Sequence, residues 1–453
     1  MADRTLLIAM TFAFIASPSI RAEELPPAPT IILPNYDRTL VGNIPSLEAG
    51  AYGARVNDAS SNWYNPAGLL HSKKTSVNAS ASAYQWTGVK AQAGESYTGS
   101  VTGAQPPSFF GVVIGSPVTS SDDLRFGFSI TNETYWAPSI QSQIPVSTPP
   151  GQEKRVLYSA RDNFTETIPA IALAFTAAPD LRIGFAVAGD IVSFQANDTA
   201  TTQITDASSQ SYYSRSSQIN ASSLNLQGSV GAQYDLTDEW KLSGVIKTRS
   251  LRLFGSSRTT IENTSSASGT FTDTAFFDPN AEFKYQRPWQ AGFGVAYVTQ
   301  PFEIEADLRY HAALGPYTAF SSTSSITTTS NSGGAPTTSE APLNDVDNQF
   351  RSITNFAIGA KYALSESVDL HGGFFTAYSP LASNDSSIFR KLDLKGVTFG
   401  ASLRIERFSG SLGAAYEWGT SDPFTVPTSS GGNASTTIKV TSLSVLYALS
   451  FSF

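Results

Sequence analysis

Few residues of this chain could carry out acid–base chemistry. Its 453 residues include three histidines, His71, His311 and His371, and no cysteine. Asp369 precedes His371 by two positions, which places both side chains on one face if the segment is a strand. A hydrolase would also need a serine aimed at that histidine. No Gly-x-Ser-x-Gly elbow lies at a strand-to-helix turn and no His-Glu-x-x-His motif occurs. We therefore expect a lumenal polar pair at Asp369 and His371, and no enzyme activity, metal or cofactor.

The composition excludes several other classes of protein. Without cysteine there is no disulfide scaffold, zinc ribbon or thiol nucleophile. The 29 basic and 37 acidic residues give a net charge of -8, which argues against nucleic-acid binding. The charged fraction of 15% is too low for a disordered acidic chain. The 28 Phe, 18 Tyr and 34 Gly beside only 2 Met favour one large β-barrel over two or three soluble domains.

The N-terminus, residues 1–22, has the pattern of a secretory signal peptide. Arg4 supplies a positive charge, residues 6–15 form an apolar core, and Ala22 offers a cleavage site. A short N-terminal membrane anchor is the alternative. The apolar core is shorter than the roughly 20 residues of a membrane-spanning helix, and no later segment is long and apolar enough for one.

The rest of the chain alternates between apolar and small or polar residues, as strands of a lipid-facing barrel do. The pattern is clearest at the C-terminus, where six large apolar residues occupy one face: Leu443, Val445, Tyr447, Leu449, Phe451 and Phe453. Short turns alternate with long Ser/Thr-rich loops, such as 197–218, 256–286 and 317–346. The pattern predicts fourteen strands, near 75–90, 106–117, 124–136, 160–177, 181–196, 219–235, 239–255, 287–299, 302–316, 347–363, 367–379, 395–406, 409–420 and 438–453.

We therefore predict an all-β fold: a 14-stranded antiparallel transmembrane β-barrel over residues 75–453, closed and without a free edge. Residues 23–74 precede the first strand. They begin with a proline-rich stretch and continue with small and mildly apolar residues that could form short helices. A segment of this length either hangs in the periplasm or plugs the lumen as an N-terminal hatch.

One motif in this segment resembles a known family. Residues 49–60 contain Asp58-Ala59-Ser60, and Asn65-Pro66-Ala67-Gly68 follows. Together they resemble the hatch motif of the FadL/TodX group of outer-membrane transporters for long-chain fatty acids and hydrocarbons. The resemblance extends over residues 45–453, and it departs at His371, where the family usually has Arg. It implies a 14-stranded barrel with a hatch, and a lateral opening at the third strand.

The third predicted strand, 124–136, carries Gly127 on its inner face. A glycine inside a strand weakens pairing and permits a kink, so Gly127 is a candidate gate residue. The alternative is an ordinary barrel glycine that leaves room for the hatch. Within the hatch, we expect residues 65–68 to form a tight turn, with Pro66 fixing the backbone and Gly68 releasing it. Asp58 and Asn65 should hydrogen-bond within the hatch or to lumenal charges.

Strand parity places charges of both signs in the lumen. The basic set is Arg125, Arg182, Lys241, Lys247, Arg249, Arg309, Arg351, Lys361 and Arg404, and the acidic set is Glu133, Glu166, Asp190, Glu303, Glu305, Asp307, Asp369, Glu406 and Glu417. Arg351 and Lys361 share one strand, about 33 Å apart. Lys361, nearer the hatch, is the better candidate to bind a ligand carboxylate. Alternatively, it pairs with a lumenal carboxylate such as Asp369.

These observations and the resemblance predict a channel in the bacterial outer membrane for passive uptake of hydrophobic compounds, with long-chain fatty acids or aromatic hydrocarbons as the expected substrates. A general porin would need a one-signed constriction and no plug. A structural or adhesive barrel would use its long loops and need no pocket. The expected partners are the hydrophobic substrate, outer-membrane lipid and lipopolysaccharide, and the barrel assembly machinery acting through the terminal Phe453. No nucleic acid is expected.

Overall fold

The structure is a computed structural model, and its described part comprises residues 31–32, 35–72, 75–93, 95–104, 108–115, 123–135, 139–145, 153–205, 210–267, 269–343, 345–382, 389–427 and 433–453. The predicted signal peptide, residues 1–22, and the first residues of the predicted hatch lie outside this part. No helix of the described part is long and apolar enough to cross a membrane.

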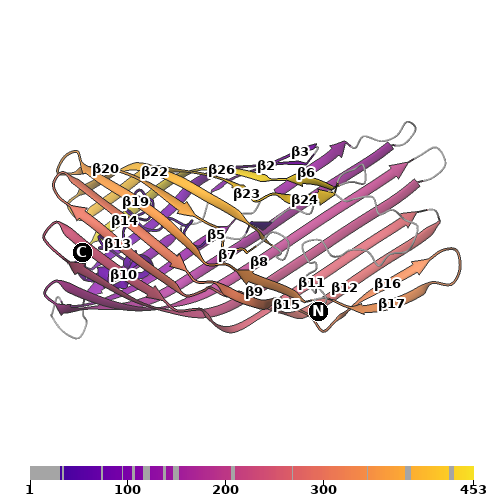
Figure 1. Cartoon of the computed structure of the whole chain (residues 1–453), viewed down its shortest axis with the longest axis horizontal. Helices are drawn as coiled ribbons and strands as arrows, with labels where there is room; N and C mark the ends of the chain where they lie inside the picture. Colours follow the sequence, from indigo (N-terminus) through magenta and orange to yellow (C-terminus); the bar gives the residue numbers. More distant parts are fainter. Residues whose placement is uncertain are drawn as a thin grey trace.

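The chain folds into a closed barrel of antiparallel strands (Figure 1). In chain order the strands are β1 (Ile31–Ile32), β2 (Ser76–Ala93), β3 (Glu95–Ala104), β4 (Phe109–Gly115), β5 (Leu124–Tyr135), β6 (Ser139–Pro145), β7 (Glu153–Ala178), β8 (Leu181–Thr205), β9 (Gln210–Asp235), β10 (Trp240–Lys247), β11 (Leu251–Ala267), β12 (Thr270–Phe283) and β13 (Gln290–Val298). They continue with β14 (Phe302–His311), β15 (Leu314–Ser321), β16 (Ser325–Asn331), β17 (Thr337–Pro342), β18 (Val346–Phe350), β19 (Ile353–Ala363), β20 (Val368–Ala377), β21 (Phe389–Arg390), β22 (Leu392–Ile405), β23 (Phe408–Ser421), β24 (Phe424–Pro427), β25 (Asn433–Thr436) and β26 (Ile438–Ser452).

Most of these segments form the fourteen positions of the wall, so the predicted fold class is confirmed. The exceptions are β1 with β21 and β24 with β25, which form two separate two-stranded sheets. Several positions are shared by consecutive segments; β10 and β11, for example, continue one another along β9. The ring closes where β2 pairs with β26 on one side and with β4 on the other. Closure satisfies the backbone hydrogen bonds that an open edge would leave unmade in lipid.

The alternation read from the sequence sets the two faces of this wall. On β26, Leu443, Tyr447 and Leu449 are exposed on the outside, whereas Ser442 and Ala448 are buried toward the lumen. The same holds on β22, where the outward Phe399 side chain is 71% exposed. Large apolar side chains that point away from the protein on strand after strand require an apolar solvent, as a lipid bilayer provides.

The long loops predicted at 197–218 and 256–286 are instead mostly strands. Strands β7 and β9 each run for 26 residues, whereas roughly 9–11 residues suffice to cross a membrane. The extra length forms a polar extension of the barrel, visible at the right of Figure 1. The prediction was wrong because Ser and Thr cover both faces there and leave no apolar alternation. Threonine nevertheless favours strands, and hydroxyl pairs such as Thr274–Thr328 link neighbouring ones.

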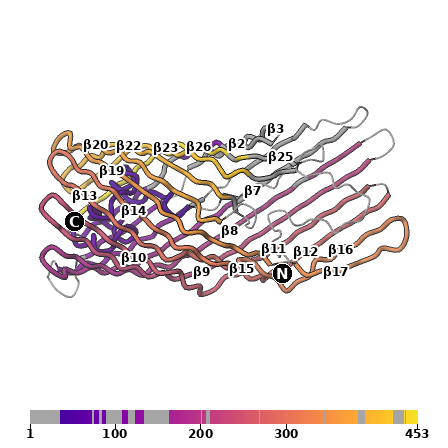
Figure 2. Tube along the Cα trace, viewed as in Figure 1, coloured from indigo at the N-terminus to yellow at the C-terminus, as the bar shows by residue number. Residues whose placement is uncertain are grey.

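Residues 35–72, here called the inner segment, lie inside the barrel at the end that holds the short turns and the C-terminus (Figure 2). The segment contains helix α1 (Ser61–Tyr64) and the 3₁₀-helix η1 (Pro66–His71). Leu47, Val56 and Leu69 are fully buried, because they pack between the segment and small residues of the wall. The lumen at this level is therefore filled.

Candidate functional site

Arg55 is the centre of the largest ion-pair network between the inner segment and the wall. Its guanidinium pairs with Glu305 at 2.8 Å, with Glu303 at 3.1 Å and with Glu48 of the inner segment itself. Its side chain is only 3% exposed. Glu305 also accepts a hydrogen bond from the Ala54 backbone N–H at 2.6 Å. Strand β14 thus carries carboxylates at alternate positions, all aimed inward at one turn of the inner segment.

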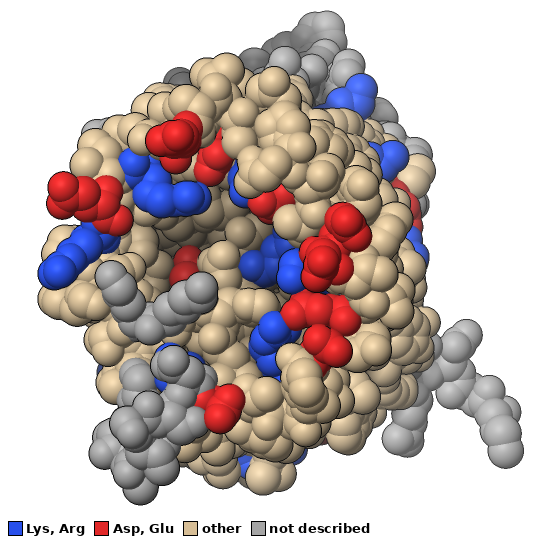
Figure 3. Space-filling view, turned by 90° about the vertical axis from the view of Figure 1, so that its left-hand side faces the viewer, with Lys and Arg blue, Asp and Glu red and all other residues tan. Residues whose placement is uncertain are grey.

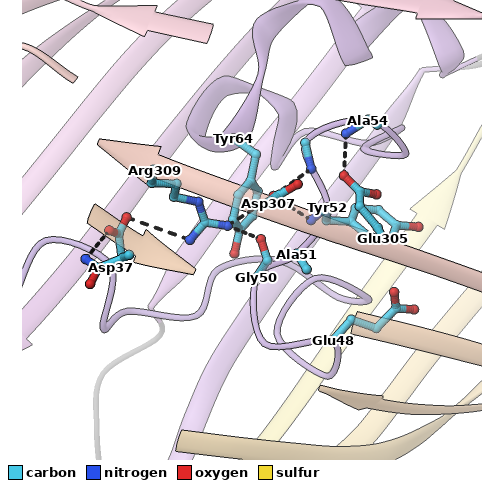
Figure 4. A network of polar contacts seen from close by, with 12 residues as sticks. Asp37, Glu48, Gly50, Ala51, Tyr52, Ala54, Tyr64, Glu305, Asp307 and Arg309 are labelled. Atoms are coloured by element: carbon cyan, nitrogen blue, oxygen red, sulfur yellow. Dashed lines mark hydrogen bonds and ion pairs between the residues drawn. The ribbon is translucent and has the colours of Figure 1, made fainter. Parts of the chain in front are cut away.

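A second network binds the beginning of the inner segment to the same strand (Figure 4). Asp37 contacts His311 Nε2 at 2.8 Å and accepts a hydrogen bond from Asn355 at 2.6 Å, and Arg309 lies 3.7 Å from its other oxygen. Burial opposes the charge of Asp37, but His311 and Arg309 outweigh it and hold the carboxyl pKa below its usual range. Asp307 accepts backbone N–H groups of the inner segment at 3.2 and 3.3 Å.

His371 has partners other than the predicted Asp369. Its Nδ1 lies 2.8 Å from Glu48 and its Nε2 lies 2.8 Å from the Ser402 hydroxyl; Asp369 pairs with Arg404 at 3.5 Å instead. The spacing matches a serine–histidine–carboxylate triad. However, Ser402, His371 and Glu48 are all buried, and none of them lines the two cavities found in the lumen. This arrangement fastens the inner segment to β20 and β22.

A third cluster, which the sequence did not reveal, lies across the lumen at Arg287. Its guanidinium pairs with Glu133 at 2.7 Å and with Glu166, and lies 3.9 Å from Asp190. If the alternation of β13 is extended backward, Arg287 should face the lipid, whereas the structure places it in the lumen. The parity reverses because the stretch between β12 and β13 is irregular and contains Pro288, which cannot donate to a ladder. A proline inside an apparent strand was the available signal.

The hatch motif forms the turn that leads into η1. Asn65 caps η1 by accepting the Ala67 N–H at 3.1 Å, and its Nδ2 donates to the Ala232 carbonyl of the wall at 2.9 Å. Pro66 is the first residue of η1, and the Gly68 N–H donates to the Asn65 carbonyl at 3.0 Å. Gly68 was predicted to release the backbone after Pro66, but it lies inside η1 and has no positive φ. It is needed because a Cβ there would collide with the Val56 carbonyl.

Asp58 is bonded inside the hatch and to the wall. Its carboxylate accepts the Ser60 N–H at 2.8 Å and the Asn78 side-chain amide at 3.3 Å. Burial raises the pKa of this carboxyl, and the bonds from Ser60 counteract the rise. At the end of η1, burial and the nearby Arg182 and Lys241 lower the pKa of His71 to about 4, so this imidazole is neutral at pH 7.

Gly127 faces the lumen as predicted. A Cβ at this position would overlap Asn62 and lie 2.9 Å from Leu69, so the glycine leaves room for the inner segment. Strand β5 pairs with β7 over its whole described length and with β4 from Arg125 to Thr131, in both cases without a register shift. The geometry therefore favours the packing role, and a role as a gate stays a prediction.

The two predicted ligand-binding cations are both paired. Lys361 pairs with Glu303, which also holds Arg55. Arg351 lies 3.2 Å from Asp393 and also donates to the Ser379 carbonyl. These contacts favour the scaffold role that was the alternative for Lys361, with Glu303 in place of the predicted Asp369.

Most of the predicted lumenal charges do line the lumen. Lys361 pairs with Glu303 and Arg309 pairs with Asp307 within the predicted set. Most of the others pair with residues outside it, which are Arg38, Arg55, Arg287, Asp235 and Asp393. Arg249, Arg404 and Glu406 do not line the lumen, because they are exposed near strand ends. The mouth at the end with the C-terminus is hollowed and carries charges of both signs (Figure 3). No single sign dominates it, unlike the constriction of an ion-selective pore.

Within the described part, two small cavities of about 30 Å³ each lie beside the inner segment. Both are lined by Trp63, Lys247 and Arg287. A cavity that binds benzene measures roughly 150 Å³, so each of these holds water-sized molecules only. A larger ligand would have to displace part of the inner segment.

Comparisons with known proteins agree with this architecture. No model of a known protein family matches the chain, and no curated protein matches it either. Among solved structures, the toluene transporter TodX of P. putida is 15% identical, with a TM-score of 0.59, and the match covers 91% of this chain and 98% of TodX. A FadL homologue of Pseudomonas aeruginosa is 12% identical, with a TM-score of 0.55 and coverages of 94% and 100%. The toluene transporter TbuX of Ralstonia pickettii is 14% identical, with a TM-score of 0.52 and coverages of 91% and 98%.

These likenesses extend over nearly the whole of both chains, while their identities are low. They confirm the fold that the hatch motif and strand count predicted. The chain is thus a plugged barrel with the fold of the FadL/TodX-type outer-membrane transporters.

Proposed function

We propose that the protein is an outer-membrane channel for the passive uptake of hydrophobic compounds. The observation that carries the proposal is a closed barrel, apolar outside, whose lumen is filled by an inner segment fastened through buried ion pairs. The solved structures of the same fold include transporters of toluene. Hydrophobic solutes cross the polar lipopolysaccharide layer poorly, and a protein that shields them along the way removes this barrier.

Each structural feature has a part in this proposal. The polar extension of β7 to β12 would reach through the lipopolysaccharide, and the apolar wall would lie in the lipid. The inner segment, as the hatch, would keep water and ions from flowing freely until a ligand displaces part of it. A general porin is less consistent with a filled lumen, and a purely structural barrel has no need of a fastened hatch.

The proposed location in the outer membrane also implies the partners of the protein. Outer-membrane lipid and lipopolysaccharide would surround the barrel. The terminal Phe453, whose side chain is 61% exposed and packs edge-on against Phe451, would present the end of β26 to the assembly machinery. Gly127 as a gate, and Lys361 or Arg351 as ligand contacts, remain part of the proposal to be tested.

Two measurements test it. Cells that lack their own uptake systems should take up oleate or toluene faster when they produce the protein. In planar bilayers the full chain should conduct ions poorly, whereas a variant without residues 23–70 should conduct well and still show a heat-modifiable band on gels. Equal uptake with and without the protein would contradict transport. An insulating barrel after the deletion would contradict the hatch.

A further inference from the structure

Three neighbouring strands, β8, β9 and β11, carry matched rows of residues on the outer face of the wall. The strands run side by side into the polar extension (Figure 1). Ile191 of β8 pairs in register with Leu224 of β9, which pairs with Phe254 of β11. Ile191 and Phe254 are exposed. This apolar row marks the edge of the lipid-facing surface that lies nearest the extension.

The next two rows toward the extension change from hydroxyl groups to long hydrogen-bond donors. The first consists of three serines, which are Ser193, Ser222 and Ser256. The second consists of three exposed residues, which are Gln195, Asn220 and Arg258. At about 3.3 Å a residue and a strand tilt of roughly 35–45°, the second row lies about 10 Å further from the membrane centre than the apolar row. The two polar rows therefore lie at the level of lipid headgroups.

Arg258 supplies a positive charge to this surface. Its guanidinium carbon lies 5.6 Å from the centroid of the Phe277 ring, which is itself exposed. Among the described residues, no carboxylate forms an ion pair with Arg258, and the next outward acid on β11 is Glu262, four residues further. A guanidinium carries five N–H donors, and contact with an aromatic face uses none of them. Arg258 can therefore bind an anion from outside the protein.

A second positive site lies beside the row of serines. Glu282 of β12 pairs in register with Ser256, and its carboxylate contacts Lys284 at 3.0 Å and Arg252 at 3.1 Å. Two cations and one carboxylate leave one positive charge, to which Arg258 adds another. The whole chain, in contrast, has a net charge of -8. A positive surface on a negative protein favours an anionic partner at this place.

We propose that this surface, formed by the three rows with Lys284, binds lipid A, the phosphorylated and acylated disaccharide that anchors lipopolysaccharide. The parts of lipid A match the rows in order. Its acyl chains lie against Ile191 and Phe254, its sugars meet the serines, and a phosphate is bonded by Arg258 with the amides of Gln195 and Asn220. Arginine suits this role because its planar fork matches two phosphate oxygens. The inference rests on the outer-membrane location in the proposed function, and it is independent of what the channel carries.

Native mass spectrometry of the full chain in a mild detergent tests the proposal by counting retained lipid A molecules over a titration. Phosphatidylglycerol, an anionic lipid without sugars, and dephosphorylated lipid A are the comparison ligands. Both should bind more weakly than lipid A. Arg258→Gln should weaken lipid A binding roughly tenfold to hundredfold, because a hydrogen bond between charged groups is lost. Arg258→Lys should retain part of the affinity, since it keeps the charge and loses the fork.

Arg407→Gln is the matched control. Arg407 is exposed in the turn between β22 and β23, at the end of the barrel that holds the C-terminus. This variant removes the same charge far from the surface and should bind lipid A as the unmodified protein does. An equal loss in Arg407→Gln and Arg258→Gln, or no loss in Arg258→Gln, would overturn the proposal.

Two results with the comparison ligands would also overturn it. Dephosphorylated lipid A that binds as tightly as lipid A would exclude the phosphate contact, and tighter binding of phosphatidylglycerol would assign the surface to another lipid. Uptake of toluene and oleate is measured separately. A protein that binds lipid A through Arg258 but takes up neither compound keeps this site and loses the channel function. Uptake without lipid A binding keeps the channel function and overturns the site.

Discussion

Replacing Arg55 with alanine should release the inner segment from the wall. Arg55 is the one cation that bridges Glu48, Glu303 and Glu305 among the described residues. Its removal leaves Glu48 and Glu305, both fully buried, facing each other without their shared cation. Lys361 still pairs with Glu303 and His371 still contacts Glu48, so part of the network survives.

The size of the effect follows from the burial. Breaking a buried ion pair by removing one partner costs about 3–5 kcal/mol, because a buried charge is left uncompensated. Each 1.4 kcal/mol is a factor of ten in an equilibrium constant. The balance between fastened and released inner segments should therefore shift by roughly a hundredfold to a few thousandfold. An effect of that size converts a rare opening into a frequent one.

Single-channel recording in planar bilayers measures this shift directly, as the fraction of time spent in conducting states. Arg351→Ala is the control, because the Arg351–Asp393 pair is 37% exposed on both sides and such pairs contribute about 0–1 kcal/mol. Arg55→Ala should open the channel far more often than Arg351→Ala. If both variants spend as little time in conducting states as the unmodified protein, while their barrels remain heat-modifiable on gels, the ion pairs of Arg55 do not hold the inner segment in place.

Three further outcomes are expected. Gly231→Ala should raise the conductance, because its Cβ would overlap the inner segment, whereas Gly244→Ala has no atom within 4 Å of the new methyl group and should be silent. Burial raises the pKa of Asp37 but His311 more than offsets this effect, so the pKa in the folded protein lies below the ordinary value of 3.8. The contact between Asp37 and His311 should therefore stabilise the inner segment fully above about pH 4 and lose this effect only as the pH falls through the lower folded pKa. A channel that already opens at pH 5–6 would contradict this expectation. Because Lys361 pairs with Glu303, Lys361→Met should leave the affinity for a fatty acid, relative to that for an uncharged alcohol of equal chain length, unchanged; a fall in this ratio would restore Lys361 as the ligand contact predicted from the sequence.

The sequence predicted the membrane-embedded part of the fold because lipid imposes a strict pattern there. Outward residues such as Leu412, Tyr447 and Phe399 must be apolar, and their neighbours must fit the lumen. That alternation fixes each strand and its face, and the terminal run to Phe453 fixes the last one. The pattern ends where the barrel leaves the lipid, so the Ser/Thr-rich strands of the extension carried no comparable signal.

The candidate site was less predictable because partners in the lumen are chosen by three-dimensional position. Strand parity placed both Lys247 and Lys361 in the lumen. Only the structure shows that Lys361 pairs with Glu303, whereas Lys247 donates to the Trp63 carbonyl and has no carboxylate partner among the described residues. Arg287 was missed because one irregular residue at Pro288 reverses the faces of the preceding stretch. Charge type and strand parity define a set of lumenal residues, while pairing depends on the path of the inner segment.

The two halves of the inner segment are fastened in different ways, and this suggests where it opens. Residues 35–56 are held by buried ion pairs to β14, β20 and β23, such as Arg38 with Glu417 at 2.9 Å. Residues 57–72 are held by hydrogen bonds to the wall, both neutral ones such as Asn62 to Ser129 at 3.1 Å and charged ones such as Arg125 to the Ser72 carbonyl at 3.0 Å, and by close packing against wall glycines. A hydrogen bond contributes about 1 kcal/mol net when both partners are neutral and about 1.5–3 kcal/mol when one is charged, less than the roughly 3–5 kcal/mol cost of breaking a buried ion pair, so displacing α1 and η1 costs less free energy than displacing residues 35–56. Residues 57–72 are also the half that borders both cavities, so the least expensive motion of the segment enlarges the open space in the lumen.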